Sequence, residues 1–364
     1  MQYQLPSYPC FQDLWDKLAK ESRPIVVYGM GNGADKLICR FERYGIKIAD
    51  FFASDGFVRG HSFHGYRVKS FSEIKESYPD FVIVLSFASN RKEVLEMLIE
   101  LDGKYEMYVP DMPVADVEEY FDREFYNANY EKICEAYDRL EDEESKRIYA
   151  AIVNYKLSGK MNFLMDAYNE RDGIYSLFRR EEIENIIDAG AYNGDTIREA
   201  KCYFPNLKSV IAIEPDRRNF KKLERYSEAE SETAVKCINS GAWSQNTEGS
   251  FSDSGNRNST VTATASYQHK ETTVSLVRID SLTNEKIDYI KFDVEGAESE
   301  ALIGADGVIT AHKPDMLVSL YHRSCDLFML TNTLGERYPW YKMYLRRQKC
   351  VPAWEIDLIL VRED

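Results

Sequence analysis

Two acidic side chains stand at the ends of short apolar runs. Asp188 follows Ile186 and Ile187, and Glu214 follows Val210-Ile-Ala-Ile. Gly190 and Gly194 bracket a turn after Asp188, and a helical pattern begins at Asp195. A strand, a glycine loop and a helix in this order let the backbone approach a ligand, because glycine lacks a Cβ and tolerates positive φ. Doubly wound α/β folds bind nucleotides at the carboxyl end of such a strand.

The spacing Asp-x-Gly-x-x-x-Gly differs from the Gly-x-Gly-x-x-Gly of dinucleotide-binding folds. A carboxylate ahead of the glycines repels a pyrophosphate but suits a cationic amine, and Glu214 can accept both hydroxyls of a ribose. Together they predict an S-adenosylmethionine site, with an ordinary βα turn and a helix-capping Asp as the alternative. The residues expected to hold this cofactor are Asp188, Gly190, Ala191, Tyr192, Asn193, Gly194, Thr196, Glu214, Pro215 and Asp293, with Asn239 or Ser240 at the adenine.

A second group of charges lies in Ile287–Val294, which is expected to be a central strand. Central parallel strands are normally near-continuous apolar runs, yet Lys291, Asp293 and the following Glu295 interrupt this one. Buried charges are costly unless they are paired, so three of them at a strand end indicate a site. The alternative is a Lys–Asp pair that only locks the sheet to the next helix.

His322 follows the next expected strand, Met316–Leu320, and faces the same presumed cleft. A lone His is more often structural, but this position makes it a candidate general base together with Asp293 and Glu295. Lys291 would hold the carboxylates or a developing alkoxide. The alternative is that Asp293, Glu295 and His322 bind Mg²⁺, which prefers hard oxygen ligands; the main interpretation assigns no metal.

The N-terminal quarter contains another strand, glycine loop and helix, with Gly29, Gly31 and Gly33 in the loop and Asp55 after the next strand. It resembles the nucleotide-sugar-associated Rossmann domains found ahead of sugar acyltransferases. The helix that follows the glycines would hold a phosphate if the loop binds a nucleotide or nucleotide-sugar. A structural or partner-docking role is the alternative.

Composition limits the class of protein. The 364 residues carry a formal net charge of −15, which argues against a broad nucleic-acid surface. Seven Cys without a Cys-x-x-Cys pair indicate reduced thiols, and no apolar run approaches the roughly 18 residues that span a bilayer. We therefore expect a cytoplasmic protein without a membrane span. Assembly into a homo-oligomer stays open.

The pattern along the chain predicts an α/β protein with two Rossmann-like domains. Residues 1–115 form the first and residues 183–364 the second, which is expected to be a seven-stranded sheet. Residues 116–182 join them as helices over Val117–Tyr126, Tyr130–Leu140 and Ser145–Leu157. Alternation in Val261–Ala265 and Thr273–Val277 predicts a β insertion, whose Ser/Asn-rich loop Ser254–Thr260 would line an acceptor site.

The motifs of the C-terminal half resemble the FkbM family of S-adenosylmethionine-dependent methyltransferases. The resemblance covers residues 183 to about 323, and its most specific part is the Lys-x-Asp-x-Glu-Gly-x-Glu string of residues 291–298. It implies a class I methyltransferase sheet and O-methylation of sugar or polyketide hydroxyls, so we expect a sugar, nucleotide-sugar or glycan substrate. Two alternatives remain open: an NAD- or nucleotide-sugar-binding oxidoreductase or epimerase that uses the N-terminal glycine loop, and a non-catalytic scaffold in glycan assembly.

Overall fold

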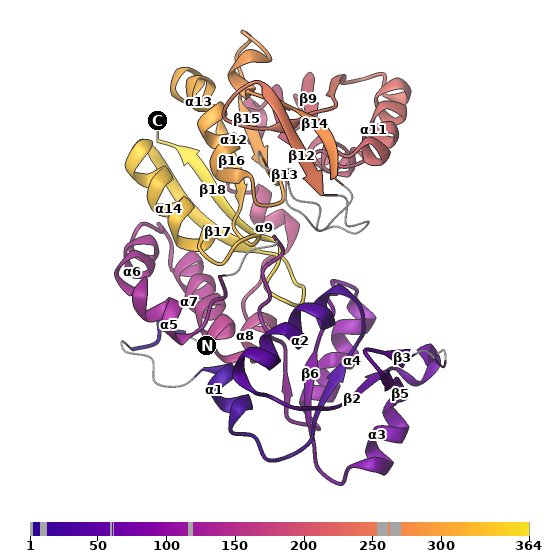
Figure 1. The fold of residues 1–364 in the computed structure, drawn as a ribbon. Helices are drawn as coiled ribbons and strands as arrows, with labels where there is room; N and C mark the ends of the chain where they lie inside the picture. Colours follow the sequence, from indigo (N-terminus) through magenta and orange to yellow (C-terminus); the bar gives the residue numbers. More distant parts are fainter. Residues whose placement is uncertain are drawn as a thin grey trace.

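Two α/β sheets, one from each half of the chain, organise the molecule (Figure 1). The computed structural model describes residues 3–7, 13–58, 60, 62–115, 119–252, 261–262 and 271–363. It confirms the predicted α/β fold class, with a five-stranded parallel sheet and a seven-stranded sheet. Within these residues no helix is both long and apolar enough to cross a bilayer.

The N-terminal sheet has the strand order β5-β2-β1-β6-β7, and all its neighbours are parallel. Its central strands are apolar on both faces, because helices cover both sides. The strands are β1 (Ile25–Tyr28), β2 (Ile48–Ala53), β5 (Lys69–Ser70), β6 (Val82–Leu85) and β7 (Met107–Tyr108), and the helices are α1 (Leu14–Ala19), α2 (Asn32–Tyr44), α3 (Phe71–Ser77) and α4 (Lys92–Asp102). A short hairpin of β3 (Ser62–Phe63) and β4 (Tyr66–Arg67) follows the 3₁₀ turn Asp55–Phe57.

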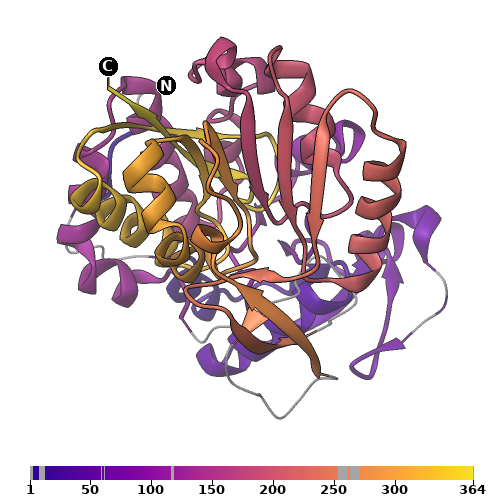
Figure 2. The ribbon, with the colours of Figure 1, turned by 90° about the horizontal axis from the view of Figure 1, so that it is seen from above.

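The C-terminal sheet has the order β10-β9-β8-β15-β16-β18-β17, in which only β18 runs antiparallel to its neighbours. Its strands are β8 (Asn185–Ala189), β9 (Ser209–Ile213), β10 (Ala234–Ile238), β15 (Tyr289–Phe292), β16 (Asp315–Ser319), β17 (Tyr341–Arg347) and β18 (Ile356–Arg362). The helices are α9 (Arg171–Tyr175), α10 (Asp195–Tyr203), α11 (Arg217–Ala229), α12 (Glu298–Gly304), α13 (Asp306–His312) and α14 (Asp326–Arg337). Seen from above, helices flank this sheet on both sides (Figure 2).

Alternation along the strands divides the core of this sheet into two faces. Ile186 packs with Tyr175 and Phe204 on the side of α9 and α10, whereas the next residue, Ile187, belongs to the core on the opposite side. Successive strand residues point to opposite faces, so both faces of the strand must be apolar. Charged residues therefore collect at the carboxyl ends of the strands.

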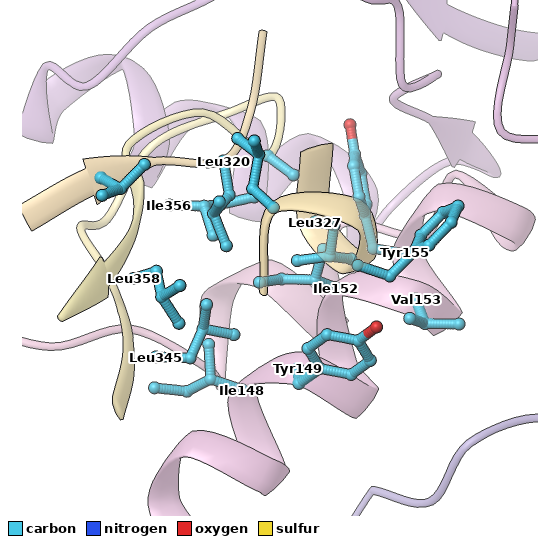
Figure 3. Close-up of a cluster of buried hydrophobic side chains, with 14 of the residues drawn as sticks. Ile148, Tyr149, Ile152, Val153, Tyr155, Leu320, Leu327, Leu345, Ile356 and Leu358 are labelled. Carbon is cyan, nitrogen blue, oxygen red and sulfur yellow. The ribbon is translucent and has the colours of Figure 1, made fainter. Parts of the chain in front are cut away.

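Four helices join the two sheets: α5 (Arg123–Ala128), α6 (Tyr130–Asp138), α7 (Glu143–Ser158) and α8 (Asn162–Met165). Figure 3 shows Ile148 and Ile152 of α7 against Leu345 and Leu358 of the C-terminal sheet. The same buried cluster continues into the N-terminal sheet, so the connecting helices belong to a shared core.

The first connecting helix begins later than the sequence predicts. Residues 117–118 of the expected helix over Val117–Tyr126 lie outside the described residues. From residue 119 onward the helix starts at Arg123, because Asp122 is extended and its side chain accepts the Phe125 N–H at 2.9 Å. A capping Asp fixes a helix start more strongly than the apolar spacing ahead of it.

The predicted β insertion is present as a small sheet. It contains β11 (Gly241–Ala242), β12 (Thr247–Ser252), β13 (Val261–Thr262) and β14 (Glu271–Val277), in the order β11-β14-β12-β13. Figure 2 shows this sheet, in orange, projecting from the larger one. The expected acceptor loop Ser254–Thr260 and the strand residues 263–265 lie outside the described residues.

Candidate active site

A cavity of about 660 Å³ opens at the carboxyl ends of β8, β9, β15 and β16. This volume is within the range of small-molecule sites. Eight carboxylates and four cationic side chains are among its lining residues: Asp195, Glu199, Glu214, Asp216, Asp293, Glu295, Glu355 and Asp357, with Arg171, Arg218, Lys222 and Lys291. The cavity therefore lies where doubly wound sheets bind ligands, and its wall is predominantly acidic.

The loop after β8 needs glycine at position 190. Gly190 has a φ of +92°, and a Cβ there would lie 1.9 Å from the Asp293 carbonyl oxygen. The backbone N–H groups of Gly190 and Ala191 both donate to the Ile213 carbonyl, each at 3.0 Å. The loop is thus held between the ends of β9 and β15, and Gly190 lines the cavity.

Glu214 lies at the end of β9, as predicted, and lines the cavity. One carboxylate oxygen accepts the Tyr192 N–H at 2.9 Å and the other accepts the Asp216 N–H at 2.8 Å. The side chain is buried, which raises the pKa of Glu214 to about 8 even though both backbone donors oppose that shift. A carboxylate has about four acceptor positions, so two of them stay available to a ligand.

Asp188 is buried behind the cavity wall and is not among its lining residues. Its carboxylate accepts a hydrogen bond from the Thr196 hydroxyl and lies 4.0 Å from the Lys291 ammonium. Burial raises the pKa of Asp188, although Lys291 and Thr196 act in the opposite direction. Thr196 does line the cavity, so Asp188 reaches a ligand through that residue.

The other expected cofactor residues divide into two groups. Tyr192, Thr196 and Pro215 line the cavity. Ala191, Asn193, Gly194, Asn239 and Ser240 are not among the lining residues. The Asn239 amide instead donates to the carbonyls of Glu214 at 2.8 Å and Pro215 at 3.2 Å, while Gly241 and Ala242 form the wall after β10.

The charges of β15 and the segment after β16 form one cluster. Asp293 accepts from the Lys291 ammonium at 3.0 Å and from the Tyr321 hydroxyl at 3.1 Å. The His322 Nε2 lies 3.5 Å from Asp293 and 3.4 Å from Glu295, and its Nδ1 lies 2.8 Å from Glu298. The structure therefore brings Lys291, Asp293, Glu295 and His322 together, as the sequence predicts.

Mutual pairing sets the protonation of this cluster. Burial works against the charged form of His322, but Glu298, Glu295 and Asp293 together raise the pKa of His322 to about 10. Burial would also raise the pKa of Asp293, but Lys291 and His322 hold it at about 2. For Glu295 burial prevails over the attraction of His322, and its pKa rises to about 8.

The cations are accordingly charged at neutral pH. Despite the opposing effect of burial, Asp293 and Asp188 hold the pKa of Lys291 above its usual value.

Within the described residues, no group of three or more His, Cys, Asp and Glu has the arrangement of a metal site.

The N-terminal glycines do not line this cavity. A Cβ on Gly33 would lie 2.1 Å from the Ser86 carbonyl oxygen, and one on Gly29 would lie 2.8 Å from Phe87. Asp55 accepts from the backbone and hydroxyl of Ser72, at 3.2 and 2.8 Å. The close approach of the chain to β6 thus accounts for two of the three glycines, and whether the loop binds a nucleotide stays a prediction.

Residues 188–331 match the family model described as the methyltransferase FkbM domain. Over this stretch the chain is similar to FkbM methyltransferase domains. This match includes the glycine loop, Glu214 and the whole Lys291–Glu298 string, and it ends within α14.

A solved structure shares the fold over nearly the whole chain. A crystal structure of methyltransferase FkbM from Methylobacillus flagellatus KT has a TM-score of 0.67 and 20% identity, and the match covers 99% of this chain and 94% of that one. An rRNA methylase from Streptococcus thermophilus (TM-score 0.35, 12% identity) covers 53% of this chain and 93% of its own. The match to SMU.1697c from Streptococcus mutans, a putative methyltransferase in complex with SAH (TM-score 0.36, 11% identity), covers 54% of this chain and 99% of that one. A comparison with curated proteins found no match.

Several residues at the FkbM domain's cavity were not predicted from the sequence. Arg171, Gln348, Glu355 and Asp357 line it from α9 and from the β17–β18 hairpin, and Asn90 lines it from the N-terminal half. Tyr321, the neighbour of His322, donates to Asp293. Its position at a strand end was a usable signal, whereas the others depend on tertiary contacts that no local pattern records.

Proposed function

We propose that the protein is an S-adenosylmethionine-dependent O-methyltransferase that acts on a hydroxyl of a sugar, nucleotide-sugar or glycan. One observation carries the proposal: Lys291, Asp293 and Glu295 line the same cavity as Gly190 and Glu214. A base and a nucleoside-binding wall therefore face one another across a space that holds small molecules.

The residues fit the cofactor. Glu214 offers two remaining acceptor positions at the end of β9, which suit two ribose hydroxyls. Gly190 lines the cavity, and the absence of a Cβ lets its loop pack directly against the Asp293 backbone. Asp188 supports the amine end through Thr196, which faces the cavity. When bound, the cofactor supplies an electrophilic methyl group, and the chain must supply alignment and a proton acceptor.

Glu295 is the proton acceptor that the geometry favours among the three candidates. A general base works best with a pKa near the working pH. The pKa of Asp293, about 2, makes it a weak base, and His322, with a pKa of about 10, is already protonated. Glu295 has a pKa of about 8 and lines the cavity, so it can take the proton of an acceptor hydroxyl.

The two cations position this base. His322 is fully buried and lies within 3.5 Å of both Asp293 and Glu295, so the imidazolium fixes the two carboxylates relative to each other. Lys291 holds Asp293 from the other side at 3.0 Å. Asp293 is thereby kept ionised, and beside its bonds from Lys291 and Tyr321 it can accept a further hydrogen bond from the substrate.

Calorimetry and mass spectrometry test the proposal. Titration of the full chain with S-adenosylhomocysteine should show binding, and NAD should not bind. Purified glycan and nucleotide-sugar pools should gain the mass of one CH₂ group after incubation with S-adenosylmethionine. The proposal is wrong if S-adenosylhomocysteine does not bind, or if NAD binds in its place at the cavity.

A further inference from the structure

The loop after β6, in the N-terminal half, reaches the cavity of the FkbM domain. Asn90 of this loop lines the cavity together with Gln348 and Glu355, which lie on either side of the β17–β18 turn. Figure 1 shows that turn, in yellow, extending toward the N-terminal half. The cavity is therefore incomplete without the N-terminal half of the chain.

Backbone hydrogen bonds fix this arrangement. The Ser89 N–H donates to the Val351 carbonyl at 2.8 Å, and the Val351 N–H donates to the Ser89 carbonyl at 2.9 Å. A second junction lies on the far side of the cluster, where the Ala115 N–H donates to the His322 carbonyl at 3.0 Å. The Lys36 ammonium of α2 donates to the carbonyls of Pro113 and Val114, which ties this segment to the N-terminal sheet.

The N-terminal glycines pack closely against the start of the loop after β6. A Cβ on Gly29 would lie 2.8 Å from both Phe87 and the Ser86 hydroxyl, and a Cβ on Gly33 would meet the Ser86 carbonyl. The Ser86 N–H and hydroxyl both donate to the Tyr28 carbonyl, at 3.0 and 3.1 Å. The glycine loop thus sets where the chain leaves β6, and with it the position of Asn90.

The side chains at this end of the cavity share a hydrogen-bonding character. We call Asn90, Gln348, Glu355 and Asp357 the acceptor wall. Its two amides both donate and accept hydrogen bonds, as hydroxyl groups do, and the Gln348 amide donates to Glu355 at 3.2 Å. Asp357 is 4% exposed, and within the described part of the chain its carboxylate accepts no hydrogen bond. A buried carboxylate of this kind needs a donor from a ligand or solvent.

The charge at the acceptor wall excludes anionic ligands. Two of the four cations that line the cavity are already paired, Arg171 with Glu199 at 2.8 Å and Lys291 with Asp293 at 3.0 Å. The other two, Arg218 and Lys222, lie on α11, after β9. A phosphate or carboxylate on the ligand would face Glu355 and Asp357 with little compensation, whereas hydroxyl and ammonium groups donate to them.

From this juxtaposition we infer that the acceptor wall binds the methyl acceptor, and that the group it holds is a polyhydroxylated, non-anionic sugar unit, uncharged or amino-bearing. This inference rests on the proposed function and narrows its substrate class. It also gives the N-terminal half a direct part in acceptor recognition.

Binding measurements on the full chain test the acceptor wall, with and without S-adenosylhomocysteine. The probes are methyl glucoside, methyl glucosaminide and glucose 1-phosphate. Their binding is measured by saturation-transfer NMR and calorimetry. The two glycosides should bind, and the phosphate should bind at least about tenfold more weakly, because like charges would be brought together.

Two variants and one control locate the site. Asn90→Ala and Gln348→Ala should each weaken glycoside binding about fivefold, the effect of losing one uncharged hydrogen bond. Lys92→Ala, two residues from Asn90 with a side chain 88% exposed, should change it less than about twofold. All three variants should bind S-adenosylhomocysteine as the parent chain does.

The inference is overturned if no glycoside binds, if glucose 1-phosphate binds as tightly as the glycosides, or if both wall variants bind like the parent. Failure of the proposed function is a separate result. In that case S-adenosylhomocysteine does not bind the parent chain, while the glycosides still bind in a manner that depends on Asn90.

Discussion

Glu295 shows how one side chain acquires its chemistry from its neighbours. It occupies a left-handed backbone conformation with a φ of +55°, which is uncommon for a residue with a Cβ. The turn places its half-buried carboxylate beside His322 and at the cavity, where partial desolvation favours the neutral acid. Strained conformations of this kind concentrate at functional sites.

We expect the pH dependence of methyl transfer to follow the pKa values of Glu295 and His322. Glu295 must be deprotonated to accept a proton, so kcat/KM should rise with pH through about 8. His322 must stay protonated to hold the carboxylates, so kcat/KM should fall through about 10. Measurement of methyl transfer across this range should give a bell-shaped curve. In Glu295→Gln, turnover should fall at least about 100-fold while S-adenosylhomocysteine affinity is kept. Full activity in that variant would refute the base assignment.

His322 also makes a contribution to stability that depends on pH. Its pKa in the folded chain is about 10, above the ordinary value of 6.5, so the contribution is complete below 6.5 and is lost as pH rises through about 10. Chemical denaturation of His322→Gln should show the largest loss near pH 6, roughly 3–5 kcal/mol, and a smaller one near pH 10. The control is His64→Gln, whose ion pair with Asp35 is about half exposed and should contribute less than about 1 kcal/mol. A loss that is equal at both pH values would contradict this prediction.

At the scale of single residues, the sequence reveals position but not environment. Asp188, Glu214 and Asp293 follow apolar runs, so their places at strand ends are predictable. Their pairing is not, because Glu298 and Tyr321 reach the cluster from other elements. For that reason the sequence leaves three candidate bases, and only the arrangement in space separates them.

Among the elements, the glycine loop after β8 is the most constrained. A Cβ at Gly190 would lie 1.9 Å from a backbone oxygen, which cannot move as a flexible side chain can, and the φ of +92° adds strain. Gly190→Ala should therefore cost roughly 3 kcal/mol and weaken S-adenosylhomocysteine binding, as measured by denaturation and calorimetry. Gly173→Ala is the matched control.

Gly173 lies in α9, where an added Cβ meets nothing within 4 Å. Alanine should stabilise the helix there by about 0.5–1 kcal/mol, with no effect on binding. If both substitutions behave alike, the close approach of Gly190 to Asp293 does not hold.

Elements with a strong apolar pattern could be predicted from the sequence. Helix ends that are set by a capping side chain could not. The apolar runs of β1, β8 and β9 and the α/β alternation fix the fold class. The start of α5 at Arg123 depends on the extended backbone of Asp122, a feature that apolar periodicity does not register. The small sheet was predicted from alternation, but its attachment through β11 to β14 pairs strands far apart in sequence.

At the scale of the whole molecule, a buried ion pair joins the segment after β7 to the connecting helices. The Lys156 ammonium in α7 donates to Asp111 at 2.6 Å, and the side chains are 3% and 6% exposed. Asp111 begins the segment that reaches Ala115 and the His322 carbonyl. The pair therefore links the shared helical core to the charged cluster around His322.

Breaking this pair from one side should be costly. Asp111→Ala leaves a buried ammonium without its partner and should cost roughly 3–5 kcal/mol, with faster hydrogen exchange at the Ala115 amide. The double change Lys156→Met and Asp111→Leu removes both charges and should restore most of the stability. Lys104→Ala is the surface control, because its pair with Glu100 is more than 60% exposed on both sides and is screened by solvent. A double variant as unstable as Asp111→Ala would rule out the uncompensated charge as the cause.

The bridge between Ser89 and Val351 consists only of main-chain atoms. Such a contact does not depend on which side chains stand beside it, so Asn90 and Gln348 can be replaced while the two halves keep their register. Sequence change at those two positions is thus uncoupled from assembly. If the proposed roles hold, a few substitutions at these two positions would exchange one acceptor for another and leave the Glu295 and Glu214 region unchanged.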